Sequence, residues 1–135
     1  DTIVVNNGRI YGKPADRNEA RVFLSELSGR THSVFTAVSL SLVSGGKVHA
    51  HSFVDESRVT FDPIPDVLME RYLDTGDSLD KAGAYGIQGP SLTFISRVDG
   101  SYSNVVGFPL SRFVHEAENF LSPFFPGATS WLSLF

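Results

Sequence analysis

The stretch Thr31–Phe61, "THSVFTAVSLSLVSGGKVHAHSFVDESRVTF", contains the pattern that decides the fold. From Thr31 to Val43 the side chains alternate with a period of two, which is typical of a β-strand. Ser44-Gly45-Gly46-Lys47 predicts a turn, and Val48–Val54 predicts a strand that pairs back as a hairpin. A further strand is expected over Arg58–Phe61. One face of the strand Thr31–Val43 is expected to carry His32, Val34, Thr36, Val38, Leu40 and Leu42.

Upstream of this hairpin the sequence predicts a strand, a turn and a helix. Thr2–Val5 is an apolar, largely β-branched run, and Asn7-Gly8 favours the positive φ angles of a tight turn. Asp16 followed three residues later by Glu19 resembles a capping box at a helix start. Gly29 marks the helix end. The apolar stripe of this helix is expected at Ala20, Phe23, Leu24 and Leu27.

Downstream of the hairpin, a second helix is expected after Pro65 and through about Tyr72, followed by a glycine-rich loop. Leu92–Val98 and Tyr102–Val106 predict a second hairpin around a turn at Asp99-Gly100, and Leu110–Leu121 predicts the last helix. This order of elements favours an α/β fold with a mixed sheet. The sequence shows no internal repeat and no long linker.

Length and composition define the class of protein. With 135 residues, 41% hydrophobic and 19% charged, the chain is expected to form one domain over residues 1–135. A net charge of −4 argues against nucleic acid as a partner, and no apolar run suggests a membrane partner. The absence of cysteine favours a cytoplasmic location. Residues 122–135 form an aromatic tail, expected to cover the core or a subunit contact, with a docking segment as the alternative.

Four polar residues lie beside glycine or proline residues or at the start of a predicted strand, and they are candidates for chemistry. Asp1 precedes the strand Thr2–Val5, Lys13 lies between Gly12 and Pro14, and Lys81 and Gln88 lie in "DKAGAYGIQG" (residues 80–89). A carboxylate with two ammonium groups suits transfer of a phosphoryl group to water, because the lysines offset phosphate charge. For each of these residues taken alone, a solvated surface position is the favoured interpretation.

Other patterns are weaker. Gly83-x-x-Gly86-x-x-Gly89 has the wrong spacing for a dinucleotide-binding loop and follows a polar turn. His49 and His51 share one face of a strand and are candidates to bind a metal, although two solvated imidazoles are the favoured interpretation. His32 and His115 have no partner visible in the sequence.

Five sequence blocks in order resemble the Maf family. They are "DTIVV…GKP" (Asp1–Pro14), "LSGRTHSVFTAVSL" (Leu27–Leu40), "ESRVTF" (Glu56–Phe61), "DKAGAYGIQG" (Asp80–Gly89) and "GSYSNVVGFPL" (Gly100–Leu110). The resemblance implies an elongated mixed sheet with two lobes around a nucleotide cleft. It also implies a house-cleaning nucleoside triphosphate pyrophosphatase that uses Mg²⁺ or Mn²⁺.

The family's functional residues carry over by position. Asp1 matches the catalytic carboxylate and is a candidate metal ligand; Lys13 and Lys81 match the lysines expected to contact phosphates. Gln88 matches the glutamine implicated in substrate contact, and its amide suits a pyrimidine edge. The loop with Lys81 and Gln88 resembles the branch that prefers dTTP and UTP. Thr36 is a weaker candidate, for which a structural role in the strand is favoured.

The chain also departs from the family pattern. A Ser-x-Ser-Pro-Arg-Arg loop, expected in a strand-helix-strand unit of roughly 30 residues before Asp1, does not occur in this sequence. The domain is therefore expected to be incomplete at its N-terminus. The alternative function is a catalytically impaired Maf-like fragment that binds a nucleotide or a protein partner. A homodimer is the candidate assembly.

Overall fold

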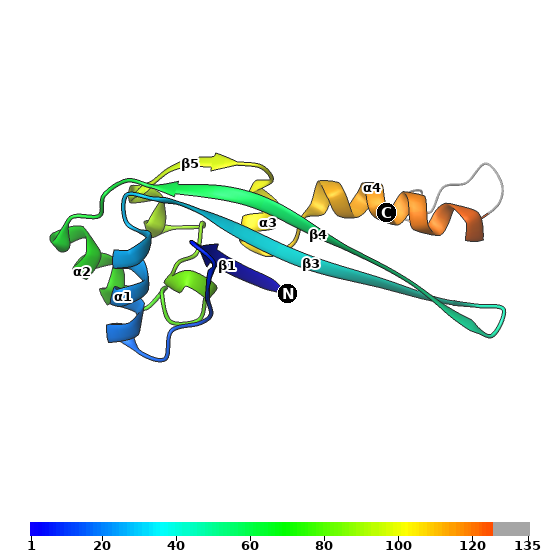
Figure 1. Cartoon of the computed structure of the whole chain (residues 1–135), viewed down its shortest axis with the longest axis horizontal. Helices are drawn as coiled ribbons and strands as arrows, with labels where there is room; N and C mark the ends of the chain where they lie inside the picture. The colour runs from blue at the N-terminus through cyan, green and yellow to red at the C-terminus, as the bar shows by residue number, and fades with distance from the viewer. Residues whose placement is uncertain (126–135) are drawn as a thin grey trace.

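The computed structural model describes residues 1–125 as one five-stranded sheet with helices at both ends (Figure 1). The strands are β1 (Thr2–Asn6), β2 (Arg9–Tyr11), β3 (Thr31–Ser44), β4 (Lys47–Phe61) and β5 (Ile95–Asp99), in the order β2-β1-β3-β4-β5. The expected combination of helices and sheet is confirmed. The expected mixed pairing is wrong for this part of the chain, because every paired neighbour is antiparallel. Tight turns join β1 to β2 and β3 to β4, which fixes these pairs as antiparallel.

The long hairpin of β3 and β4 forms an arm that extends beyond the rest of the sheet (Figure 1). The sequence predicted two separate strands after the turn, whereas β4 is continuous through Asp55 and Glu56. These polar residues interrupt the apolar pattern, but the strand continues because each one still pairs with a residue of β3. The predicted alternation is confirmed where β3 crosses the core: His32, Val34 and Thr36 are buried.

Helix α1 (Arg17–Leu27) forms as the sequence predicts. The Asp16 carboxylate accepts a hydrogen bond of 2.8 Å from the Glu19 amide, as a capping residue does. Gly29 follows the helix with φ +68, a conformation that favours glycine. The four predicted apolar positions, Ala20, Phe23, Leu24 and Leu27, are all buried against the sheet and its loops.

Helix α2 (Asp66–Asp74) and the short helices η1 (Ala82–Ala84) and η2 (Pro90–Thr93) complete the lobe around α1. Aromatic rings fill the centre of this lobe in edge-to-face pairs, with centroid distances of 4.7 to 5.4 Å. The participating rings are His32, Phe61, Tyr72, Tyr85 and Phe94.

The predicted second hairpin is wrong. Strand β5 is followed by a helix, α3 (Tyr102–Val106), where the sequence suggested a returning strand. The β-branched residues favoured a strand, but the Ser101 hydroxyl accepts a hydrogen bond from the backbone amide of Asn104 and caps a helical turn. The side-chain amide of Asn104, which is fully buried, donates to the Val34 carbonyl at 3.2 Å and to the Ser57 hydroxyl at 3.1 Å. Tertiary hydrogen bonds thus favour the helix.

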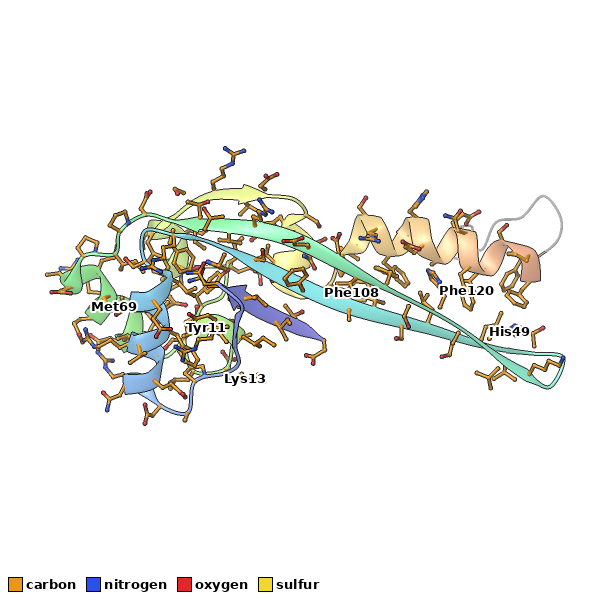
Figure 2. All side chains as sticks on the ribbon, viewed as in Figure 1. Tyr11, Lys13, His49, Met69, Phe108 and Phe120 are labelled. Carbon is orange, nitrogen blue, oxygen red and sulfur yellow. The ribbon has the colours of Figure 1, made fainter. Side chains whose placement is uncertain are left out.

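Helix α4 (Leu110–Leu121) has the predicted bounds and lies along the arm, with Phe108 before its start and Phe120 near its end (Figures 1 and 2). The Glu116 carboxylate is 2.8 Å from His51 Nε2, and the Arg112 guanidinium donates to the Val54 carbonyl at 2.6 Å.

A further short helix, η3 (Ser122–Phe124), ends the described chain. The proposed aromatic tail lies outside the described residues from position 126 onward. Within residues 1–125 no helix has the length and hydropathy needed to cross a membrane.

The loop at residues 80–89 is packed tightly, although its composition suggested a flexible segment. Ala84, Tyr85 and Ile87 are buried. The Gly83 amide donates to the Gly12 carbonyl at 3.1 Å, and a Cβ atom at Gly83 would lie only 3.0 Å from Val4 Cγ2. Glycine is required here both for its φ of +72 and for this close approach to β1.

We expect Gly83→Ala to lower the free energy of unfolding by about 2 to 4 kcal/mol, since it adds overpacking to backbone strain. Gly76→Ala is the matched control, because Gly76 has nearly the same φ, +73, with nothing within 4 Å of an added Cβ. The control should lose only about 1 kcal/mol. Equal losses in urea denaturation would contradict the proposed packing role.

Candidate active site

A cleft of about 500 Å³ opens on one face of the sheet, and all four predicted site residues line it. Its floor is formed by β1 and β3, one wall by residues 77–88 and the other by the end of α3. The lining residues are Asp1, Thr2, Val4, Lys13, Val34, Asp77, Lys81, Ala82, Tyr85, Gly86, Ile87, Gln88, Val105, Val106 and Gly107. Segments that are distant in sequence therefore form one cleft, in which polar side chains and a largely apolar lining come together.

Asp1 lines the cleft and immediately precedes β1. The Ala37 amide donates to the Asp1 carbonyl at 2.9 Å, so the backbone of Asp1 is paired with β3. The Thr2 amide donates to Asp1 Oδ1 at 2.9 Å, which fixes the orientation of the carboxylate. Among residues 1–125, no hydrogen bond engages Oδ2. This oxygen is available to a ligand or to water.

Lys13 and Gln88 present exposed polar ends to the cleft. Lys13 lies two residues after the end of β2, and the residue that follows it, Pro14, is buried. Gln88 follows buried Ile87, so its position is set by the packed loop. In the described part of the chain, neither side chain has an ion-pair partner within 4 Å or a hydrogen bond. Both groups are free to meet a ligand.

Lys81 is the most restrained cation of the cleft. Its ammonium group lies 2.9 Å from Asp77 Oδ1 and 2.9 Å from Asp80 Oδ1. The hydrogen bonds to Asp80 and then to Asp77 raise the pKa of Lys81 above its ordinary value. Lys81 is therefore fully charged at neutral pH.

Two buried tyrosines hold the loop that carries Lys81. The Tyr72 hydroxyl donates to Asp77 Oδ2 at 2.8 Å and accepts from the Gly86 amide at 3.4 Å. The Tyr85 hydroxyl lies 2.7 Å from His32 Nε2, deep in the core. Burial raises the pKa of both phenols, so both remain neutral hydrogen-bonding groups.

Sequence reasoning missed Asp77, Tyr72 and the partner of His32. The one available signal was that Asp77 and Lys81 have opposite charges and lie only four residues apart, although the segment between them is a turn and not a helix. No signal connected His32 with Tyr85, because these residues are 53 positions apart. Thr36, for which a structural role was favoured, is buried and bonds the Thr2 hydroxyl at 2.9 Å.

The described residues contain no group of three or more His, Cys, Asp or Glu side chains arranged to hold a metal ion. His51 instead pairs with Glu116 and stacks on Phe120, while His49 packs against Phe124. Asp1 offers a single carboxylate. This fits Mg²⁺, which is commonly held by one or two carboxylates together with substrate phosphates.

The fold and site define an α/β protein with a cleft of charged and apolar residues beside an antiparallel sheet. The sequence profile of the family described as Maf-like protein matches residues 1–120. The chain therefore belongs to the Maf family.

Curated relatives agree with this assignment. Proteins named dTTP/UTP pyrophosphatase from Shouchella clausii and Halalkalibacterium halodurans are 48% identical over 120 residues and 51% identical over 114 residues. These alignments cover 89% and 84% of this chain, and 61% and 58% of the respective relatives. A protein of the same name from Symbiobacterium thermophilum is 47% identical over 128 residues, which is 94% of this chain and 63% of that relative. The chain thus spans about three fifths of the length of these relatives.

His32 generates a prediction about pH. Burial lowers the pKa of His32 from 6.5 to about 4, so the folded protein holds a neutral imidazole while the unfolded chain binds a proton below pH 6.5. Stability is therefore lost as the pH falls from about 6.5 to about 4. We expect the wild type to lose roughly 3 kcal/mol more than His32→Gln over this window in urea denaturation. An identical pH dependence in both proteins would contradict a buried neutral His32.

Proposed function

We propose that the protein of which this chain forms all or part hydrolyses dTTP and UTP, and related pyrimidine nucleotides, to the monophosphate and pyrophosphate. The single observation that carries the proposal is the convergence of Asp1, Lys13, Lys81 and Gln88 in one cleft. Family membership and the names of the relatives support the same reaction. The cleft volume of about 500 Å³ suits a small-molecule ligand.

The proposed chemistry begins at Asp1. Its Oδ2 accepts a proton from a water molecule as the water oxygen bonds to the α-phosphorus, which is general base catalysis. The bond between the α-phosphorus and the oxygen that bridges to the β-phosphorus then breaks, and the electron pair leaves with pyrophosphate. The amide of Thr2 holds the carboxylate in one orientation for this step.

Lys13 and Lys81 stabilise the negative charge that develops on the leaving pyrophosphate. Both residues line the same cleft as Asp1, which supports this role. Mg²⁺ or Mn²⁺, held by Asp1 and the phosphate oxygens, would supply further neutralisation of the polyphosphate. Gln88, with both a donor and an acceptor, contacts the base edge.

A nucleotide-binding domain without turnover is the second candidate function. Such a domain would retain the cleft and its lysines. Binding of dTTP without pyrophosphate release would distinguish this candidate from the enzyme.

The role of Asp1 is tested by Asp1→Asn, which keeps the shape of the side chain and removes the base. We expect kcat for dTTP with Mg²⁺ to fall by about a hundredfold or more, while KM changes little. Pyrophosphate release is the measurement, and Asp99→Asn, outside the cleft, is the control. Equal turnover by Asp1→Asn and the wild type would remove Asp1 from the mechanism.

Base selection is tested by Gln88→Ala. We expect kcat/KM for dTTP and UTP to fall about tenfold, because a hydrogen-bonded polar contact is lost in a cleft. Hydrolysis of 7-methyl-GTP is measured in parallel. This purine nucleotide lacks the thymine or uracil edge, so its hydrolysis should not fall. A uniform loss across all three nucleotides would show that Gln88 contacts a part that they share.

A further inference from the structure

The ammonium group of Lys81 is already fully occupied in the free protein. An ammonium group has three N–H donors. The acceptors around Lys81 are Asp77 Oδ1 at 2.9 Å, Asp80 Oδ1 at 2.9 Å and the Asp77 carbonyl at 3.4 Å. A phosphate oxygen can bond to this group only if one of these three acceptors is replaced.

The two aspartates are held very differently. The Asp77 side chain is 22% exposed, and its second carboxylate oxygen accepts a hydrogen bond of 2.8 Å from buried Tyr72. Its backbone amide also donates to the Thr75 hydroxyl at 3.2 Å. The Asp80 side chain is 77% exposed, and Lys81 is its one side-chain hydrogen-bond partner among residues 1–125. Asp80 is therefore the acceptor that can move away at little cost.

Asp80 lies within the influence of both cleft lysines. The Lys81 ammonium lowers the pKa of Asp80 below its ordinary range, and the charge of Lys13 contributes in the same direction. A carboxylate that interacts with two cations occupies an electrostatic position that also suits a phosphate group. Asp80 thus occupies the position beside Lys81 that an anionic ligand would otherwise take.

The stem of Lys81 is confined by the backbone of Gly86. A Cβ atom at Gly86 would lie 2.5 Å from Lys81 Cε and 2.6 Å from Cδ, so the lysine side chain runs directly over this glycine. The Gly86 amide in turn donates to the Tyr72 hydroxyl that bonds Asp77. Asp77, Tyr72 and Gly86 therefore fix the ammonium group without help from Asp80.

We propose that Asp80 is an exchangeable internal counter-ion, which a phosphate oxygen replaces on Lys81, and that Asp77 is the positioning residue that keeps the ammonium group in the cleft during this exchange. The identity of the phosphate ligand rests on the proposed function. The arrangement of Asp77, Asp80 and Lys81 is independent of that proposed function. The two aspartates therefore have opposite effects on binding of a polyphosphate.

The first test measures binding of inorganic pyrophosphate by titration calorimetry to the wild type and to matched Asp→Asn variants. Asp80→Asn removes a competitor and should tighten binding about two- to fivefold, the range for an exposed ion pair. Asp77→Asn releases the ammonium group and should weaken binding about tenfold. Asp74→Asn is the control: it also removes an exposed, ion-paired carboxylate, here from Arg17, and should change binding less than about twofold.

Tighter binding by Asp80→Asn is decisive, because damage to the fold cannot produce it. Thermal unfolding of each variant shows whether weaker binding by Asp77→Asn reflects loss of structure. If Asp80→Asn binds pyrophosphate no more tightly than the wild type does, or if Asp77→Asn retains wild-type affinity, the proposal is wrong.

A second test needs no ligand and separates this inference from the proposed function. Nitrogen-15 NMR detects the ammonium protons of Lys81 when hydrogen bonds protect them from exchange with water. The signal should persist in Asp80→Asn and disappear in Asp77→Asn. The reverse pattern would overturn the inference. If the signals behave as expected but no variant binds pyrophosphate or dTTP, the proposed function fails while the assignment of the two aspartates stands.

Discussion

The close approach of Gly83 to Val4 is the constraint on which the cleft depends. The contact joins the loop at residues 80–89 to β1, and the hydrogen bond from Gly83 to Gly12 joins it to the segment that carries Lys13. Asp1 immediately precedes the same strand, β1. A side chain at position 83 would push these segments apart. One short contact between backbone and side chain therefore brings the carboxylate and both lysines of the cleft together.

Charges in this cleft are organised by buried neutral groups. Tyr72 holds Asp77, which holds Lys81, while Tyr85 and His32 anchor the loop from the core. The buried ends of these networks remain uncharged at neutral pH, so no isolated charge is buried at high cost. The ionised groups lie at the solvent side, where they can meet a ligand. This layered arrangement gives the cleft fixed charges without an unpaired ion in the core.

Local signals in the sequence predicted several elements well. The period of two in β3, the cap at Asp16 and the apolar stripe of α1 each depend on neighbouring residues, and each is confirmed. Predictions were wrong where distant contacts compete with local preference. The β-branched pair Val105–Val106 favours a strand, but the buried hydrogen bonds of Asn104 to β3 and β4 stabilise a helix. Similarly, β4 continues through its polar segment because β3 supplies partners throughout.

The sequence by itself determined the family, the main hairpin and the four candidate residues of the cleft, because ordered motifs and short-range periodicity are properties of a linear chain. Tertiary structure alone decided that these four residues share one cleft and that Lys81 is bound by two unequal aspartates. It also joined His32 to Tyr85 across the core. The physical reason is that burial and hydrogen-bond partners depend on packing between distant segments. The same carboxylate is a fixed support at position 77 and an exposed counter-ion at position 80, and only its surroundings make the difference.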